Sequence, residues 1–160
     1  MAEPKPLEFD GRRLLPEGIH HATMVEIDKH FATFQRSDRR IRLFEHLKRY
    51  VREIQTAQWN VSIIIDGSFI MPPVDEPGDI DVILVLPQDW DNDADLRPFE
   101  YNLLSKRVVK REYKFDLVAV RKGSSEEEHW VRFFSQVKVD WCRMFGWPED
   151  SKKGIVRIVP

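Results

Sequence analysis

The spacing of apolar residues predicts two helices in the first third of the chain. Thr23 followed by Glu26 forms a capping-box pattern, which predicts a short helix over residues 24–32. Ser37 is a suitable N-cap for a longer helix that ends near Ala57. Apolar residues recur in this longer segment at intervals of three and four, so one face is expected to be buried. That face consists of Ile41, Phe44, Leu47, Val51 and Ile54.

The remaining pattern alternates between strands and helices. Short β-branched or alternating apolar runs predict strands over residues 61–66, 79–86, 113–120 and 154–159. Pro98 suits the first turn of a helix over residues 98–107, and a second capping-box signal predicts a helix over residues 126–144. The apolar residues of the last helix are expected in the core: Trp130, Phe133, Phe134, Val137 and Trp141.

This order of elements predicts an α/β (α+β) fold, a small mixed β-sheet with flanking helices. The proline- and glycine-containing stretch over residues 1–19 is expected to be an N-terminal arm. Residues 20–160 are expected to form one domain, in line with a length of 160 residues.

Composition excludes several classes of protein. The chain has 42% hydrophobic and 32% charged residues and a net charge of −2, which is ordinary for a globular domain. It has no apolar run of about 18 residues, so no membrane-spanning helix and no membrane partner are expected. The first residues lack the apolar region of a secretory signal. Cys142 is the only cysteine, so an intramolecular disulfide is excluded, and we expect a cytoplasmic protein.

Charge is segregated along the chain. The segment from Gly67 to Leu96 has no Lys or Arg but has eight acidic residues. Two other segments, residues 36–53 and 106–114, are rich in bases. The plain interpretation is solvated helix faces and an acidic loop. The functional interpretation is an acidic cation site with nearby bases that hold a polyphosphate or RNA.

Three aspartates interrupt apolar strands. Asp79 and Asp81 are two residues apart, so in a strand both carboxylates would project from one face. Neighbouring carboxylates repel each other unless a cation lies between them. Asp116 lies between Phe115 and Leu117, where an unpaired carboxylate would be costly. If the two strands are neighbours, three carboxylates converge, which is enough to hold two divalent metal ions for phosphoryl or nucleotidyl transfer.

Gly67 and Ser68 follow the first apolar strand directly. Glycine lets the backbone approach a ligand closely. Backbone N–H groups and the Ser68 hydroxyl could then bind phosphate oxygens. Either this Gly-Ser pair or the Asp-x-Asp pair alone is a weak signal, but the combination with a third strand aspartate is much more specific.

The pattern IIIDGSF, GDIDVIL and KFDLV resembles the nucleotidyltransferase superfamily related to DNA polymerase beta, in particular its small stand-alone members. Gly67, Ser68, Asp79 and Asp81 match the family motif, and Asp116 matches its third carboxylate. The motif covers residues 66–118, and a wider likeness to uncharacterised bacterial members covers residues 14–158.

This resemblance implies the nucleotidyltransferase fold and transfer of a nucleoside monophosphate from an NTP, expected to be ATP, to a hydroxyl. The cofactor would be Mg²⁺ or Mn²⁺. Asp79 and Asp81 would hold the metals and the triphosphate, Asp116 would bind the catalytic metal and help activate the acceptor, and Gly67 and Ser68 would hold the β/γ-phosphates. Many family members have bases after Gly-Ser, but the segment FIMPPVDEP has none. Other bases are then the candidates for the triphosphate: Arg111, Lys114, Lys152 and Lys153.

The sequence does not identify the acceptor of the nucleoside monophosphate. A tRNA end or a protein side chain would both suit the family, and members of this size are often half of a toxin–antitoxin or defence pair, which implies a partner protein. The alternatives are a non-catalytic module that binds a partner protein or RNA, and a phosphohydrolase that uses the same metals. If RNA is the acceptor, one basic helix face is expected to attract its phosphates. The bases of that face are Arg39, Arg40, Lys48, Arg49 and Arg52.

Overall fold

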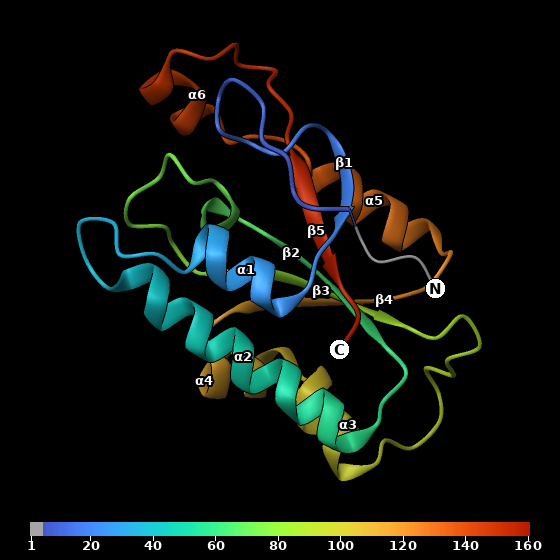
Figure 1. Ribbon diagram of the computed structural model, residues 1–160. Helices are drawn as coiled ribbons and strands as arrows, with labels where there is room; N and C mark the ends of the chain where they lie inside the picture. The colour runs from blue at the N-terminus through green and yellow to red at the C-terminus, as the bar shows by residue number, and fades with distance from the viewer. Residues whose placement is uncertain (1–4) are drawn as a thin grey trace.

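The computed structural model describes residues 5–160 and has a mixed α+β architecture. Over these residues the chain forms a five-stranded mixed sheet and six α-helices (Figure 1). The strands are β1 (Gly18–His21), β2 (Ser62–Asp66), β3 (Asp81–Leu86), β4 (Asp116–Arg121) and β5 (Gly154–Ile158). The helices are α1 (Met24–Phe31), α2 (Arg39–Ala57), α3 (Pro98–Leu104), α4 (Lys106–Tyr113), α5 (Ser125–Phe134) and α6 (Val139–Phe145).

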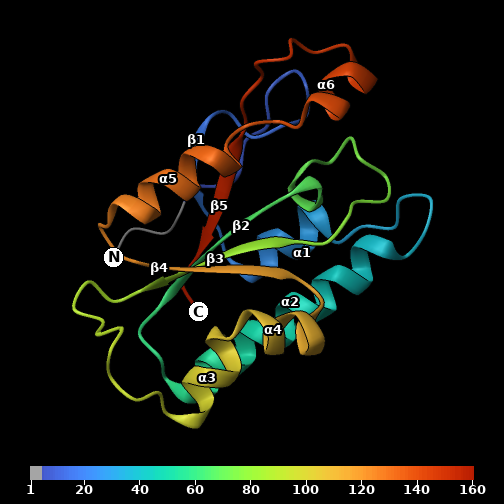
Figure 2. The ribbon, with the colours of Figure 1, turned by 180° about the vertical axis from the view of Figure 1, so that it is seen from behind.

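The order of strands in the sheet is β1-β5-β2-β3-β4. The pairs β1–β5 and β3–β4 are parallel, whereas β2 is antiparallel to both β5 and β3. The central strands are apolar on both faces, as expected for strands covered from both sides. Figure 2 shows α2, α3 and α4 on one side of the sheet and α5 on the other. The predicted α/β class with a mixed sheet and flanking helices is therefore confirmed.

The two N-terminal helices follow the sequence pattern closely. The Thr23 side chain accepts a hydrogen bond from the Glu26 backbone, and the Glu26 side chain accepts one from the Thr23 backbone, which completes the predicted capping box. Helix α2 begins at Arg39 and ends at Ala57, with Asp38 rather than Ser37 as its N-cap residue. Its apolar stripe is buried except for Ile41, which is partly exposed.

Three predicted elements have different bounds in the structure. The helix expected over residues 98–107 ends at Leu104, and α4 continues separately because Ser105 caps it. The strand expected over residues 113–120 begins at Asp116, because α4 extends to Tyr113 and Lys114 ends that helix in a left-handed conformation. The strand expected over residues 79–86 begins at Asp81, so Asp79 lies in the loop before β3.

The prediction of one continuous helix over residues 126–144 is wrong. The structure has two helices there, α5 and α6. Val137 leaves the helical path and donates its backbone N–H to Ser151, while its side chain is buried in a second small core. Consequently the expected aromatic stripe is only partly in the core, and Phe133 is 52% exposed. Cys142 is buried, as predicted.

Of the stretch expected as an N-terminal arm, residues 1–4 lie outside the described residues, and residues 5–19 contribute side chains to the core. Leu7 and Leu15 belong to the main core. The strand β1 was not predicted and crosses the expected boundary at residue 19. No helix within residues 5–160 combines the length and the apolar character needed to cross a bilayer.

Candidate functional site

One rung of the sheet carries three carboxylates. In the β2–β3 pair Asp66 lies opposite Asp81, and in the β3–β4 pair Asp81 lies opposite Asp116. Neighbouring strands are about 4.8 Å apart, and residues paired in this way project from the same face. Asp66 is buried, Asp81 is half-buried and Asp116 is exposed, so the row opens toward solvent at the β4 edge. Strand pairing therefore places Asp81 and Asp116, both predicted from the sequence, side by side.

Asp79 reaches the same cluster from the loop. Its carboxylate contacts Arg39 of α2 at 3.1 Å and Lys110 of α4 at 2.7 Å. Lys110 Nζ also lies 3.2 Å from Asp116. Because one ammonium contacts both carboxylates, the contacting oxygens of Asp79 and Asp116 can be no farther apart than the sum of these two distances. The hydrogen bond from Lys110 is the largest cause that holds the pKa of Asp79 below its usual value.

Gly67 ends β2 against this cluster. It has a φ of +95°, which L side chains rarely adopt. A Cβ atom added there would lie 3.2 Å from Asp81 Oδ2 and 3.3 Å from the backbone oxygen of Asp79. The turn therefore requires glycine both for its backbone angle and for space beside the carboxylates.

Ser68 has a partner in the structure. Its hydroxyl oxygen accepts a hydrogen bond of 3.0 Å from the backbone N–H of Gly78. This bond joins the Gly67–Ser68 turn to the residue just before Asp79. The hydroxyl hydrogen is still available to donate to an anion.

The electrostatics of Asp81 favour an additional cation. Burial is the main cause that raises the pKa of Asp81, to about 6, and the negative charges of Asp66 and Asp116 raise it further. Lys138, the N-cap residue just before α6, and Lys153 oppose this shift. Lys138 was not singled out from the sequence, because nothing local in its segment relates it to residues far away in the chain.

Asp66 and Lys153 form a buried ion pair that sequence reasoning missed as a pair. Lys153 Nζ donates to the Asp66 carboxylate and, at 2.9 Å, to the backbone oxygen of Phe134. Burial raises the pKa of Asp66, and the charge of Lys153 opposes the rise. The signal in the sequence was an acidic residue at the end of an apolar strand, which indicates a buried partner but not its identity.

This pairing changes the set of bases available for a triphosphate. Lys153 is buried and already paired, so of the four predicted candidates it is the least accessible. Arg111 pairs with Glu112 at 2.9 Å, and Lys114 donates to the backbone oxygen of Arg111. Lys152 is exposed.

Arg40 was expected on a basic helix face that attracts RNA. This prediction is wrong, because Arg40 is a buried structural residue. It is fully buried, and its guanidinium donates only to backbone oxygens. Desolvation lowers its pKa to about 10. The acceptors are the carbonyls of Phe31, Ser68, Phe69, Met71 and Val74.

These contacts explain how a proline-rich segment follows the Gly-Ser turn. Pro72 and Pro77 have no backbone N–H, so they cannot close turns with the carbonyls of Phe69 and Val74 three residues earlier. Arg40 supplies the missing donors from α2. It thereby holds the segment that carries the Gly-Ser turn and leads to Asp79.

The carboxylates of the cluster are chemically suited to bind a divalent cation, but their arrangement in this structure does not form a metal site. Carboxylate oxygens are the ligands that Mg²⁺ and Mn²⁺ prefer, and Lys110 shows that a cation is stabilised between Asp79 and Asp116. Within residues 5–160, however, no group of three or more His, Cys, Asp or Glu side chains is arranged to hold a metal ion. A metal would therefore need side chains to move, above all Lys110.

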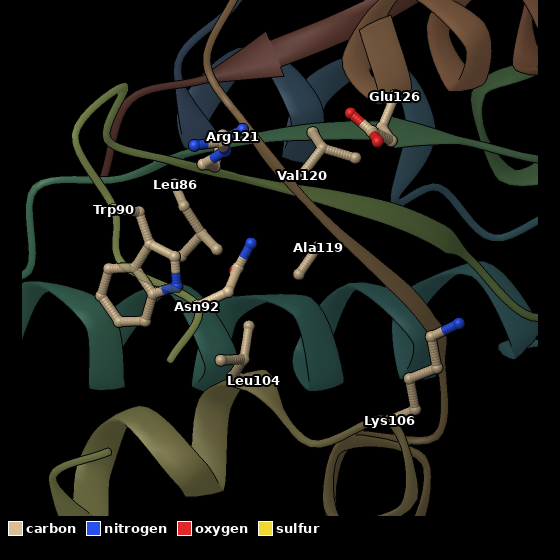
Figure 3. Close-up of a pocket in the computed structure, with 9 residues that line it drawn as sticks. All are labelled: Leu86, Trp90, Asn92, Leu104, Lys106, Ala119, Val120, Arg121 and Glu126. Carbon is tan, nitrogen blue, oxygen red and sulfur yellow. The ribbon is translucent and has the colours of Figure 1, made fainter. Parts of the chain in front are cut away.

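A separate pocket of about 360 Å³ lies beside β4 and does not include the carboxylates. Trp90, Leu104 and Ala119 face one another across it, and Lys106 and Glu126 lie at its rim (Figure 3). No site residue predicted from the sequence lines this pocket.

The fold and the site define an α+β domain with a carboxylate cluster at one end of a mixed sheet and a Gly-Ser turn against it. The chain belongs to DUF6932, which is described as a family of unknown function and whose model matches residues 7–159. No curated protein and no solved structure matches the chain.

Proposed function

We propose that this protein has the nucleotidyltransferase fold and transfers a nucleoside monophosphate from an NTP, with Mg²⁺ or Mn²⁺, to a hydroxyl of a macromolecule. The observation that carries the proposal is the pairing of Asp81 with Asp116 on adjacent parallel strands, with Gly67 packed against Asp81. The Lys110 contacts that join Asp79 to Asp116 add the third carboxylate.

The proposed step is a displacement at the α-phosphorus. The acceptor oxygen forms a bond to this phosphorus, the bond to the bridging oxygen breaks, and pyrophosphate leaves. Asp116 is the most exposed of the three carboxylates and is suited to accept the hydroxyl proton. Bound divalent metal would stabilise the charge on the attacking and leaving oxygens. Asp79, Asp81 and Asp116 would hold the metal, while the Gly67 turn and the Ser68 hydroxyl would bind the β/γ-phosphates.

A basic surface next to the carboxylates supports an anionic substrate or acceptor. Burial lowers the pKa of His46 on α2, and the positive charges of neighbouring bases lower it further. These bases are Arg49, Lys114, Arg39 and Arg42. They extend from the cluster along α2 and the end of α4, so they could draw tRNA phosphates or an acidic partner surface toward the site.

The test is incorporation of label from each α-³²P-labelled NTP, with Mg²⁺ or Mn²⁺, into total tRNA or lysate protein separated on a gel. We expect incorporation by the wild type and none by Asp81→Asn or Asp116→Asn, with Lys106→Met as a charge-removing control outside the cluster. Release of label without incorporation would favour a phosphohydrolase.

A non-catalytic module that binds a partner protein or RNA is the second candidate. The observation that favours it is Lys110, whose ammonium lies where a metal would be expected. This candidate predicts salt-dependent tRNA binding, weakened by reversing Arg49 and Arg52 to Glu, with no transfer to any acceptor. Salt-independent or absent binding would contradict RNA as the partner.

A further inference from the structure

Lys110 occupies the space between two of the carboxylates that the proposed function assigns to metal. Its Nζ is 2.7 Å from Asp79 and 3.2 Å from Asp116, and its side chain is 47% exposed. We propose that Lys110 is an internal counter-cation that competes with divalent metal: its ammonium holds Asp79 and Asp116 in the metal-free protein and leaves when a metal ion binds them. This inference rests on the metal-binding part of the proposed function.

The geometry makes the two cations mutually exclusive. Carboxylate oxygens lie about 2.0–2.6 Å from Mg²⁺ or Ca²⁺, so an ion that bridges both carboxylates would occupy nearly the same place as the ammonium. Two positive charges at this distance also repel each other. The divalent ion has the stronger field, but its net affinity is reduced by the free energy needed to break the two lysine contacts.

Lys110 is able to leave, whereas Arg39 is not expected to. The lysine has a flexible stem and, apart from these carboxylates, no hydrogen-bond acceptor is found for its ammonium among residues 5–160. Arg39 contacts the other oxygen of Asp79 and is also anchored to the backbone oxygen of Pro77 at 3.0 Å. We therefore expect Arg39 to hold Asp79 in place while Lys110 swings into solvent.

The competition changes the charge of the cluster when metal binds. With the Lys110 ammonium in place and Arg39 on Asp79, two positive charges offset the two carboxylates. The freed ammonium would lie beside the cluster, where phosphate oxygens of a bound nucleotide could accept its hydrogen bonds. Metal and nucleotide are then expected to bind more tightly together than separately.

The experiment titrates Mn²⁺ alone, without nucleotide, and follows free Mn²⁺ by electron paramagnetic resonance. We expect Lys110→Met to tighten Mn²⁺ binding about three- to tenfold, because exposed ion pairs contribute modestly. Lys110→Arg keeps the charge and should bind like the wild type. Lys106→Met removes a charge from the same helix but at the separate pocket, so it should also leave binding unchanged.

The outcomes separate this inference from the proposed function. Wild-type affinity in Lys110→Met, or weaker binding, would overturn the competition while leaving a metal site intact. No Mn²⁺ binding by either protein at millimolar concentration would overturn both. A gain in Lys110→Met that survives the added Asp116→Asn change would show that the ion binds elsewhere and would also overturn the inference. Thermal unfolding of each variant checks that the fold is retained.

Discussion

Replacing Arg40 with methionine tests how the loop around the candidate site is held. Arg40 is fully buried and donates to five backbone carbonyls, although it lies in a basic stretch of an otherwise amphipathic helix. Methionine has a similar length and a lower desolvation cost, but it donates no hydrogen bond. The substitution therefore removes the donors and retains most of the packing.

The magnitude follows from the carbonyls that would lose their donor. Those of Phe69 and Val74 are the most affected, because the prolines three residues later cannot replace Arg40. Leaving a buried carbonyl unpaired costs about 1–3 kcal/mol. With two or three such groups, and partial relief from no longer burying a charge, we expect a loss of about 3–5 kcal/mol. For a domain of this size the melting temperature should fall by about 10–15 °C.

Urea unfolding followed by tryptophan fluorescence measures this loss, because the chain has five tryptophans. The matched control is Arg39→Met, the neighbouring residue on the same helix. It loses a partly exposed ion pair with Asp79 and one hydrogen bond to the Pro77 carbonyl, and should change stability by about 1 kcal/mol or less. Arg40→Lys should recover only a small part of the loss, because one ammonium cannot match the guanidinium fork. A loss below 1 kcal/mol in Arg40→Met would refute this role.

Three further predictions concern the candidate site. Because the folded pKa of Asp81 is raised to about 6, its ionisation above that pH destabilises the metal-free protein. Asp81→Asn should therefore stabilise it at pH 8 by about 1–2 kcal/mol and have less effect as pH falls toward 4; urea unfolding at the two pH values checks this, and equal effects at both would contradict the shift. Gly67→Ala should destabilise more than Gly146→Ala, since both glycines have positive φ but only Gly67 would crowd a carboxylate; equal changes in melting temperature would exclude crowding. Lys153→Met should cost about 3–5 kcal/mol by leaving Asp66 buried and unpaired, and adding Asp66→Asn should restore much of it; an additive double variant in denaturant unfolding would disprove the pairing.

Much of the secondary structure was determined by local sequence. Local sequence signals mark four elements: the capping box of α1, the apolar stripe of α2 and the short apolar runs of β2 and β5. The predicted bounds of these elements differ from the observed ones by at most two residues. The same local reasoning singled out Asp81 and Asp116, because an acidic residue within an apolar strand needs a partner wherever the strand lies. It also singled out Gly67 as a residue that follows a strand directly.

The tertiary structure decided which residues meet. Lys153 pairs with Asp66 although 87 residues separate them, and no local pattern specifies such a partner. Arg40 and Arg39 are adjacent and equally basic, yet helical geometry turns one into the core and the other toward Asp79. Lys110 was one base in a charged run until the packing of α4 placed it between two carboxylates. Charged side chains are long and versatile, so their roles depend on the long-range contacts that only the folded chain creates.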